Sequence, residues 1–331
     1  MSSDNERLNV AIVGLGKMGM LHASILNVLP GVDVVAVCDK SWLMRKLAKN
    51  TLNVSLVTDK LDDLDDLNLD ALFITTPIPS HYNIIKKAYT DNIVSNIFVE
   101  KTLASNYSQS KELCDLSQTT QGIAMVGYMK RFSVTFNKAK TLLSNKVLGD
   151  LISFDAYAYS SDFADMKDTT NSIARGGVIE DLGSHTVDMA LWFFGDLTIR
   201  SAKTLSITPD STDSASFELD GMAGLRGNCS VSWIKEGYRM PEFGFTITGR
   251  KGILIVDDNE LTLQLTDDQS LHLYRQDLND NVPFLLGDPE YYREDDHFIK
   301  SIINKECPRS NFQTAMKVDQ LLDDVRLKSH A

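Results

Sequence analysis

Two groups capable of moving protons lie four residues apart near the middle of the chain. Asp181 and His185 fall within residues 176–195, GGVIEDLGSHTVDMALWFFG. Apolar spacing predicts a helix over 181–194 of this segment. Side chains four residues apart share one face of a helix. An imidazole with an ordinary pKa of about 6.5 exchanges protons near neutral pH, so the pair is a candidate for acid/base chemistry. On residue types alone, a structural hydrogen bond between the two side chains is the commoner alternative.

A second charged pair, Glu100 and Lys101, follows the apolar run 97–99. Two charges at the end of a strand are usually just solvated by water. In a doubly wound sheet, however, ligands bind at the carboxyl ends of the strands. We therefore expect Glu100 and Lys101 to lie beside a bound cofactor.

A glycine-rich turn indicates which cofactor this is. The sequence GLGKMG at 14–19 has the pattern GxGxxG, directly follows the apolar run 10–13 and opens a predicted helix. Its first glycine permits a tight turn, its second lets the backbone approach a pyrophosphate, and its third lets helix and strand pack closely. The helix N-terminus then faces the phosphates. A glycine-rich turn without a ligand is the alternative. The predicted contacts are Gly14, Gly16, Lys17, Met18 and Gly19.

Asp39 follows the second apolar run, 33–38, and stands twenty residues after Gly19. A carboxylate at this place accepts hydrogen bonds from the ribose hydroxyls and repels a 2′-phosphate. The predicted cofactor is therefore NAD. Lys40 and Arg45 are close in sequence and keep NADP open as an alternative.

The segment after the fourth apolar run, 71–75, supplies further candidates at the same sheet edge. A role in shaping the turn and capping the next helix at Ser80 is the alternative. The candidates for cofactor contact are Thr75, Thr76, Pro77 and His81.

Six apolar runs alternate with helical segments over the first 130 residues, which is typical of βαβ units around a parallel sheet. The predicted strands are 10–13, 33–38, 54–57, 71–75, 97–99 and 123–127. The predicted helices are 18–28, 42–49, 81–90 and 108–119. The acidic segment 59–70 is expected to form a solvated loop and short helix.

The pattern changes after residue 128. A helix at 136–144, a strand at 152–159, a polar loop at 160–171 and a helix at 181–194 precede a series of alternating runs that ends near residue 278. Such runs predict antiparallel strands of one open sheet. Helical periodicity returns over 292–328. We predict an α/β protein with a dinucleotide-binding Rossmann domain, 1–128, and an α+β domain, 129–331, that binds substrate and forms oligomers.

The composition argues against several classes of function. The 331 residues are 43% hydrophobic, enough to bury the cores of two domains. A net charge of −12 leaves no basic surface for nucleic acid, and no apolar run is long enough to span a bilayer. The start MSSDNERLNV lacks a secretory pattern. Because the four cysteines and six histidines are scattered, we expect a cytoplasmic protein with reduced thiols and no metal site.

In this order, the motifs resemble those of the Gfo/Idh/MocA family, which includes glucose-fructose oxidoreductase and inositol dehydrogenase. The resemblance covers nearly the whole chain. It is carried by GLGKMGMLHA at 14–23, TTPIPSH at 75–81, VEKTLA at 99–104, GYMKRF at 127–132 and the segment 176–195. The family implies a Rossmann domain and an open, mostly antiparallel sheet that often forms the oligomer interface. Its members mostly oxidise a secondary hydroxyl of a sugar, sugar derivative or cyclitol, or run the reverse reduction.

The resemblance also implies roles for particular residues. Lys101 matches the lysine that binds the reacting hydroxyl, and His185 matches the proposed acid/base histidine. Asp181 matches the carboxylate that orients the substrate or relays the proton. The family usually has proline after the lysine, whereas this chain has Thr102, which lacks the fixed φ of proline.

Several interpretations remain open from the sequence. The chain is either an NAD(P)-dependent dehydrogenase of a polyol or sugar, or a catalytically silent dinucleotide-binding regulator; retention of all three site residues favours the enzyme. A nucleotide-linked sugar, an aromatic diol or a tetrapyrrole is an alternative substrate. Arg131 and Arg175 are the candidates for substrate contact. The open sheet predicts a homodimer or homotetramer.

Overall fold

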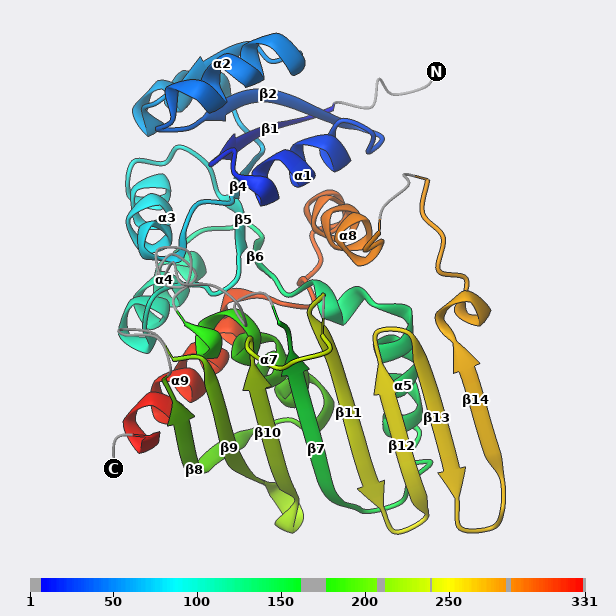
Figure 1. Ribbon diagram of the computed structural model, residues 1–331. Helices are drawn as coiled ribbons and strands as arrows, with labels where there is room; N and C mark the ends of the chain where they lie inside the picture. Colours follow the sequence, from blue (N-terminus) through cyan, green and yellow to red (C-terminus); the bar gives the residue numbers. More distant parts are fainter. Residues whose placement is uncertain (1–6, 162–176, 207–211, 239, 284–286, 330–331) are drawn as a thin grey trace. The chain divides into compact units, whose positions relative to one another are not determined.

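The computed structural model describes residues 7–161, 177–206, 212–238, 240–283 and 287–329 (Figure 1). The chain divides into two compact units. The first consists of Met1–Tyr128 and Val282–Met316, and the second of Met129–Asn281 and Lys317–Ala331. The sequence predicts a division after residue 128 but places all later residues in the second domain. In the structure, 282–316 instead join the first unit.

The first unit contains a six-stranded sheet in the order β3-β2-β1-β4-β5-β6, with every neighbouring pair parallel. This order is that of a doubly wound dinucleotide-binding sheet, which confirms the predicted fold class. The strands are β1 Leu8–Val13, β2 Val32–Cys38, β3 Leu56–Thr58, β4 Ala71–Ile74, β5 Asn96–Glu100 and β6 Ala124–Gly127.

Helices connect these strands, as the alternating pattern predicts. They are α1 Lys17–Leu26, α2 Trp42–Thr51, α3 His81–Thr90 and α4 Tyr107–Thr119. A further helix of the first unit, α8 Glu290–Asn304, comes from the later part of the chain. The acidic segment forms a short 3-10 helix, Leu61–Leu67, that buries Leu64 and exposes its carboxylates.

Aromatic packing explains why α8 belongs to the first unit. Phe73 of β4 stacks on Phe98 of β5 with 4.7 Å between ring centroids. The ring of Phe298 from α8 meets Phe73 edge-on at 5.3 Å. All three side chains are fully buried. The apolar periodicity of 292–304 therefore marks a helix that completes the core of the parallel sheet.

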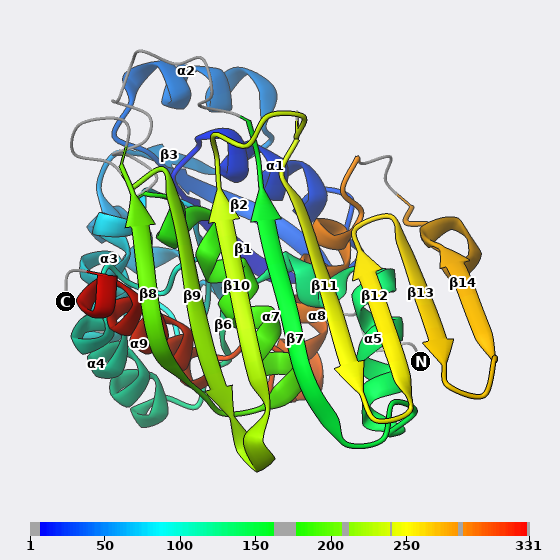
Figure 2. The same cartoon turned by 60° about the horizontal axis from the view of Figure 1, so that its bottom comes forward.

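The second unit contains an eight-stranded sheet in the order β14-β13-β12-β11-β7-β10-β9-β8 (Figure 2). Neighbouring strands in this sheet are antiparallel, except that β7 and β10 are parallel. Strand β7 comes earlier in the chain and lies between β10 and β11. The strands are β7 Leu151–Tyr159, β8 Leu197–Leu205, β9 Ser214–Gly221, β10 Arg226–Ser232, β11 Glu242–Gly249, β12 Gly252–Asp257, β13 Glu260–Leu265 and β14 Ser270–Tyr274.

Helices α5, Val134–Ser144, and α7, Ser184–Phe194, pack on one face of this sheet (Figure 2). Phe154 of β7 points to that face and stacks on Phe194 of α7 at 4.3 Å. Alternate residues of the strands point to the opposite face, where Ile253 and Ile255 of β12 are 39% and 47% exposed. The sheet therefore has one face packed on helices and one face that no helix of the second unit covers among the described residues. Helix α9, Phe312–Ser329, begins in the first unit and continues into the second.

We predict that Phe298→Ala lowers the free energy of unfolding by about 3–5 kcal/mol, because it removes a fully buried ring from the core of the first unit. Ile303→Ala is the matched control, since Ile303 lies on the same helix and is 58% exposed. Urea unfolding of both variants checks this. Equal losses in the two variants would show that α8 does not belong to that core.

Candidate active site

The glycine-rich turn joins β1 to α1 at the carboxyl edge of the parallel sheet. Gly14 has φ +96°, a backbone conformation that only glycine adopts at low cost. A Cβ atom at Gly19 would lie 1.9 Å from the carbonyl oxygen of Gly14, so no larger residue fits there. The Thr75 hydroxyl, at the end of β4, donates to the same oxygen at 2.6 Å.

The turn is shaped to receive a pyrophosphate. Gly16 precedes the first residue of α1, and a Cβ atom built on it would meet nothing within 4 Å. Open space at this glycine is what close backbone approach to a phosphate requires. The residues of the turn therefore fit a bound dinucleotide, with the N-terminus of α1 facing its phosphates.

Asp39 stands at the end of β2, as predicted, and its carboxylate already connects two loops. One oxygen accepts from the amide of Leu15 at 2.5 Å, and the other accepts from the amide of Ser41 at 2.6 Å. Each carboxylate oxygen has a second lone pair, so both can also accept from ribose hydroxyls.

The two cations that left NADP open are engaged by protein groups. The Lys40 ammonium donates to the carbonyl oxygen of Asp59 at 2.7 Å. The Arg45 guanidinium donates to the carbonyl oxygens of Asp39 and Lys40 at 2.7 and 3.0 Å. Because both cations already donate to protein groups, these contacts favour NAD over NADP, whose 2′-phosphate would need them.

The segment after β4 is held by side-chain hydrogen bonds. The Ser80 hydroxyl lies 2.7 Å from both the Thr76 hydroxyl and the carbonyl oxygen of Pro77. Ser80 occupies the position before α3, but its side chain makes no capping hydrogen bond there. His81 is fully buried, with both ring nitrogens on backbone carbonyl oxygens. Its imidazole therefore acts on loop conformation.

Strand β5 ends in Glu100 and places Lys101 at the sheet edge. The Glu100 side chain is buried, and its two oxygens lie 3.0 Å from Nε2 of His22 and 3.2 Å from the amide nitrogen of Lys101. Lys101 is half-buried, and the peptide bond between it and Thr102 is cis.

In the second unit, His185 is the second residue of α7, and Asp181 lies in the π-helical turn Ile179–Gly183 just before it. The sequence predicts a single helix from 181; in the structure the first part of that segment is a wider turn. Asp181 is half-buried. His185 is 7% exposed, and its ring meets Phe243 of β11 edge-on at 5.1 Å.

Arg131 is buried in an ion pair with Asp188, three residues after His185. Its Nε and Nη2 atoms donate to the carboxylate at 2.8 and 2.6 Å. Burial raises the pKa of Asp188, and the guanidinium opposes that rise. The pair anchors α7 to residues 129–132. Arg175, the other candidate for substrate contact, lies outside the described residues.

The structure places Lys130 and Asp258 beside Phe243, whose ring contacts His185. The ammonium of Lys130 is 2.6 Å from Oδ1 of Asp258 and 4.7 Å from the centre of the Phe243 ring. The other oxygen of Asp258 accepts from the Phe243 amide at 3.1 Å. Phe243 is thus held between Lys130 and the edge of His185. A buried lysine needs a carboxylate, but the sequence did not show which one.

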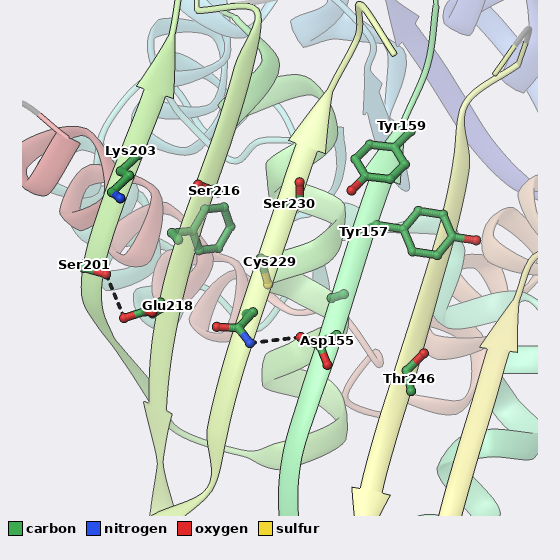
Figure 3. A pocket seen from close by; sticks show the side chains of 13 residues that line it. Asp155, Tyr157, Tyr159, Ser201, Lys203, Ser216, Glu218, Cys229, Ser230 and Thr246 are labelled. Carbon is green, nitrogen blue, oxygen red and sulfur yellow. Dashed lines mark hydrogen bonds between the residues drawn. The ribbon is translucent and has the colours of Figure 1, made fainter. Parts of the chain in front are cut away.

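A pocket of about 430 Å³ lies on the other face of the second unit's sheet (Figure 3). Tyr157 and Tyr159 line it, with Lys203 and Glu218 on neighbouring strands. None of the predicted site residues lines it. Because it opens away from the face on which α7 packs, it is a separate feature from His185.

The described residues hold no group of three side chains with the geometry of a metal site. Cys38, Cys114 and Cys229 are buried free thiols, and Cys307 is an exposed one. No helix within the described ranges is both long and apolar enough to cross a membrane.

Comparison with known proteins identifies both parts of the chain. Residues 8–128 match the GFO/IDH/MocA model of an oxidoreductase family with an NAD-binding Rossmann fold. Residues 136–255 match the GFO/IDH/MocA C-terminal domain. The two matches follow one another along the chain.

Individual relatives are distant. The scyllo-inositol 2-dehydrogenase (NAD(+)) of Bacillus subtilis is 27% identical over 191 residues, 57% of this chain and 54% of that protein. This chain therefore spans about half the length of that relative. The myo-inositol 2-dehydrogenase of Thermotoga maritima is 22% identical over 319 residues, 91% of this chain and 90% of that protein.

A solved structure of levoglucosan dehydrogenase, in complex with NADH and L-sorbose, has the same fold. It superimposes with a TM-score of 0.90 at 19% identity and covers 98% of this chain and 97% of its own.

We predict that Gly16→Ala and Gly19→Ala separate cofactor binding from folding. Gly16→Ala should keep the melting temperature and raise the Kd for NADH about tenfold or more, because the added methyl group enters the space for the pyrophosphate. Gly19→Ala should lower the melting temperature, because its methyl group collides with Gly14. Thermal melts and fluorescence titration with NADH check both. Unchanged NADH binding in Gly16→Ala would contradict the placement of the pyrophosphate.

Proposed function

Because the chain belongs to the GFO/IDH/MocA family of NAD-binding oxidoreductases, we propose that it transfers hydride between NAD and a secondary hydroxyl of a sugar, sugar derivative or cyclitol. The observation that carries this proposal is the retention of Lys101 at the end of β5 and of Asp181 and His185 at the start of α7. Relatives named as inositol dehydrogenases support the class of substrate.

Cofactor binding follows from the first unit. The N-terminus of α1 and the open space at Gly16 would receive the pyrophosphate, and Asp39 would accept hydrogen bonds from the adenosine ribose. Thr75, Thr76 and Pro77 border the same sheet edge. NAD, when bound, supplies the nicotinamide carbon that accepts hydride.

The acid/base step falls to three side chains. In the proposed oxidation, the Lys101 ammonium donates a hydrogen bond to the reacting hydroxyl and stabilises the developing alkoxide. His185 accepts the hydroxyl proton, and Asp181 orients the substrate or relays that proton. The carbon that bears this hydroxyl would give its hydride to the nicotinamide that bound NAD supplies. In the reverse reduction, the carbonyl carbon would receive the hydride and its oxygen the proton.

The structure bears on the alternative substrates. A nucleotide-linked sugar carries a diphosphate that needs free cations. Lys130 and Arg131, the two cations of the motif at 127–132, are buried against Asp258 and Asp188. This favours a neutral polyol or sugar. The role of Arg131 in this proposal is therefore to support the helix that carries His185, and contact of Arg175 with substrate remains a prediction.

We predict that Lys101→Ala and His185→Ala each lower kcat by about 10²- to 10⁴-fold, because each removes a group that handles the hydroxyl proton or its charge. The Kd for NADH should stay unchanged in His185→Ala. Absorbance of reduced nicotinamide, with a panel of inositols, aldoses and nucleotide-linked sugars, measures turnover. Lys203→Ala, in the pocket of Figure 3, is the control and should keep full activity.

Two outcomes would contradict this proposal. If either variant keeps wild-type turnover, the replaced residue does not take part in transferring or stabilising the hydroxyl proton. NADH binding without turnover of any substrate in the panel would favour the catalytically silent regulator.

We further propose a homodimer or homotetramer that covers the open face of the second unit's sheet. Exposed Ile253 and Ile255 on that face support this, because burying them in a partner removes apolar surface from water. We predict that Ile255→Glu lowers the oligomeric mass measured by size-exclusion chromatography with light scattering. Ile303→Glu, on α8, is the control. A monomeric wild-type protein at micromolar concentration would refute the proposal.

A further inference from the structure

Two buried histidines lie on either side of the Lys101 backbone in the first unit. His22 belongs to α1 and His81 is the first residue of α3. Both side chains are fully buried. Neither is exposed to touch a substrate, so their contacts with the chain around Lys101 are the feature to explain.

His22 connects two carboxylates. Its Nδ1 lies 2.9 and 3.0 Å from the two oxygens of Asp295 in α8, and its Nε2 lies 3.0 Å from Oε1 of Glu100. Ionised carboxylates only accept hydrogen bonds, so with Asp295 and Glu100 ionised both ring nitrogens donate and the imidazole is a cation. Burial acts to lower the pKa of His22, but Asp295 and then Glu100 overcome it and raise that pKa well above its usual value.

Glu100 transmits this contact to Lys101. Its second oxygen, Oε2, accepts from the Lys101 amide at 3.2 Å. Gly127 of the neighbouring strand closes the other side, since a Cβ atom there would lie 3.5 Å from the same oxygen. The imidazolium fixes one oxygen of Glu100, and that carboxylate fixes the backbone that carries Lys101.

His81 holds the chain on the far side of Lys101. Its Nδ1 lies 2.8 Å from the carbonyl oxygen of Thr102, and its Nε2 lies 2.8 Å from the carbonyl oxygen of Thr76. Carbonyl oxygens only accept, so a neutral ring donates to one of the two and merely contacts the other. In either tautomer His81 packs between the loops that follow β4 and β5. The Thr102 hydroxyl donates to the carbonyl oxygen of Ala104 at 3.0 Å, which fixes the same loop further along.

We propose that His22 and His81 are positioning residues for Lys101, and that Asp295 in α8 acts through His22. The inference deepens the proposed function and rests on it for the role of Lys101. The ammonium can only be aimed at a hydroxyl if the main chain on both sides is fixed, and misplacement by about 1 Å costs up to about 100-fold in rate. A helix from the end of the first unit thus controls a residue at its sheet edge.

The network is sensitive to pH. The titratable groups that face His22 are the carboxylates of Asp295 and Glu100 and the phenol ring of Tyr291, which is edge-on at 6.2 Å. Because its folded-state pKa is raised, His22 contributes stability that is complete below the unfolded value of about 6.5 and is lost as pH rises through the folded value. Burial lowers the pKa of His81, and the carbonyl groups of Thr102 and Thr76, then Glu100, oppose that shift, so His81 instead costs stability as pH falls below about 6.5.

The experiment compares His22→Gln, Asp295→Asn and His81→Gln with a control, Asp296→Asn, whose carboxylate pairs with Lys300 on the surface of α8. Lys101 is labelled by isotopic reductive methylation, which keeps its charge, and its NMR signal is assigned with Lys101→Arg. We expect the three variants to shift that signal and lower kcat about 10- to 100-fold, with little change in the Kd for NADH. The control should match wild type.

Variants with an unmoved Lys101 signal and unchanged kcat would overturn the inference. If the variants do not fold, nitrogen NMR of wild-type His22 decides: protons on both ring nitrogens at neutral pH support the network, and a neutral ring refutes it. The NMR signal of Lys101 can be measured even if the wild-type protein oxidises no substrate. Absence of wild-type turnover therefore tests the proposed function, and an unmoved Lys101 signal in the variants tests this inference.

Discussion

The parallel sheet of the first unit imposes one constraint on which the candidate site depends: all six strands end at the same edge. The loops that leave this edge are tied to one another. Leu15 in the glycine-rich turn donates to Asp39 after β2, and Thr75 after β4 donates to Gly14. His81 then connects the segment after β4 with the segment after β5. The cofactor-binding turn and the Lys101 backbone are parts of one network.

The sequence predicted most of this unit because its signals are local. Apolar runs, the glycine pattern and the acid after β2 each lie within about 30 residues, the size of one βαβ unit. Strand β3 is the weakest case: it was predicted at 54–57 and lies at Leu56–Thr58. A three-residue edge strand has too little periodicity to locate. Likewise, the periodicity of 292–304 predicts a helix but cannot say which core buries it.

The motifs suggest which chemical groups form the candidate site, but they do not reveal the side chains that hold those groups in place. Asp181, His185 and Lys101 are recognisable by motif, whereas Asp295 and Asp258 are partners 273 and 128 positions away from His22 and Lys130. No local pattern marks such a partner; only the need to neutralise a buried charge requires it. The same need explains why Arg131, predicted to contact substrate, is paired with Asp188.

We propose that Lys101 and His185 act on one substrate hydroxyl. A double-mutant cycle of kcat, with Lys101→Ala, His185→Ala and the double variant, tests it most directly. Two groups that serve one proton transfer should be strongly non-additive, so the double variant should lose little more activity than the worse single variant. Fully additive losses would mean that the two residues act independently and would contradict this proposal.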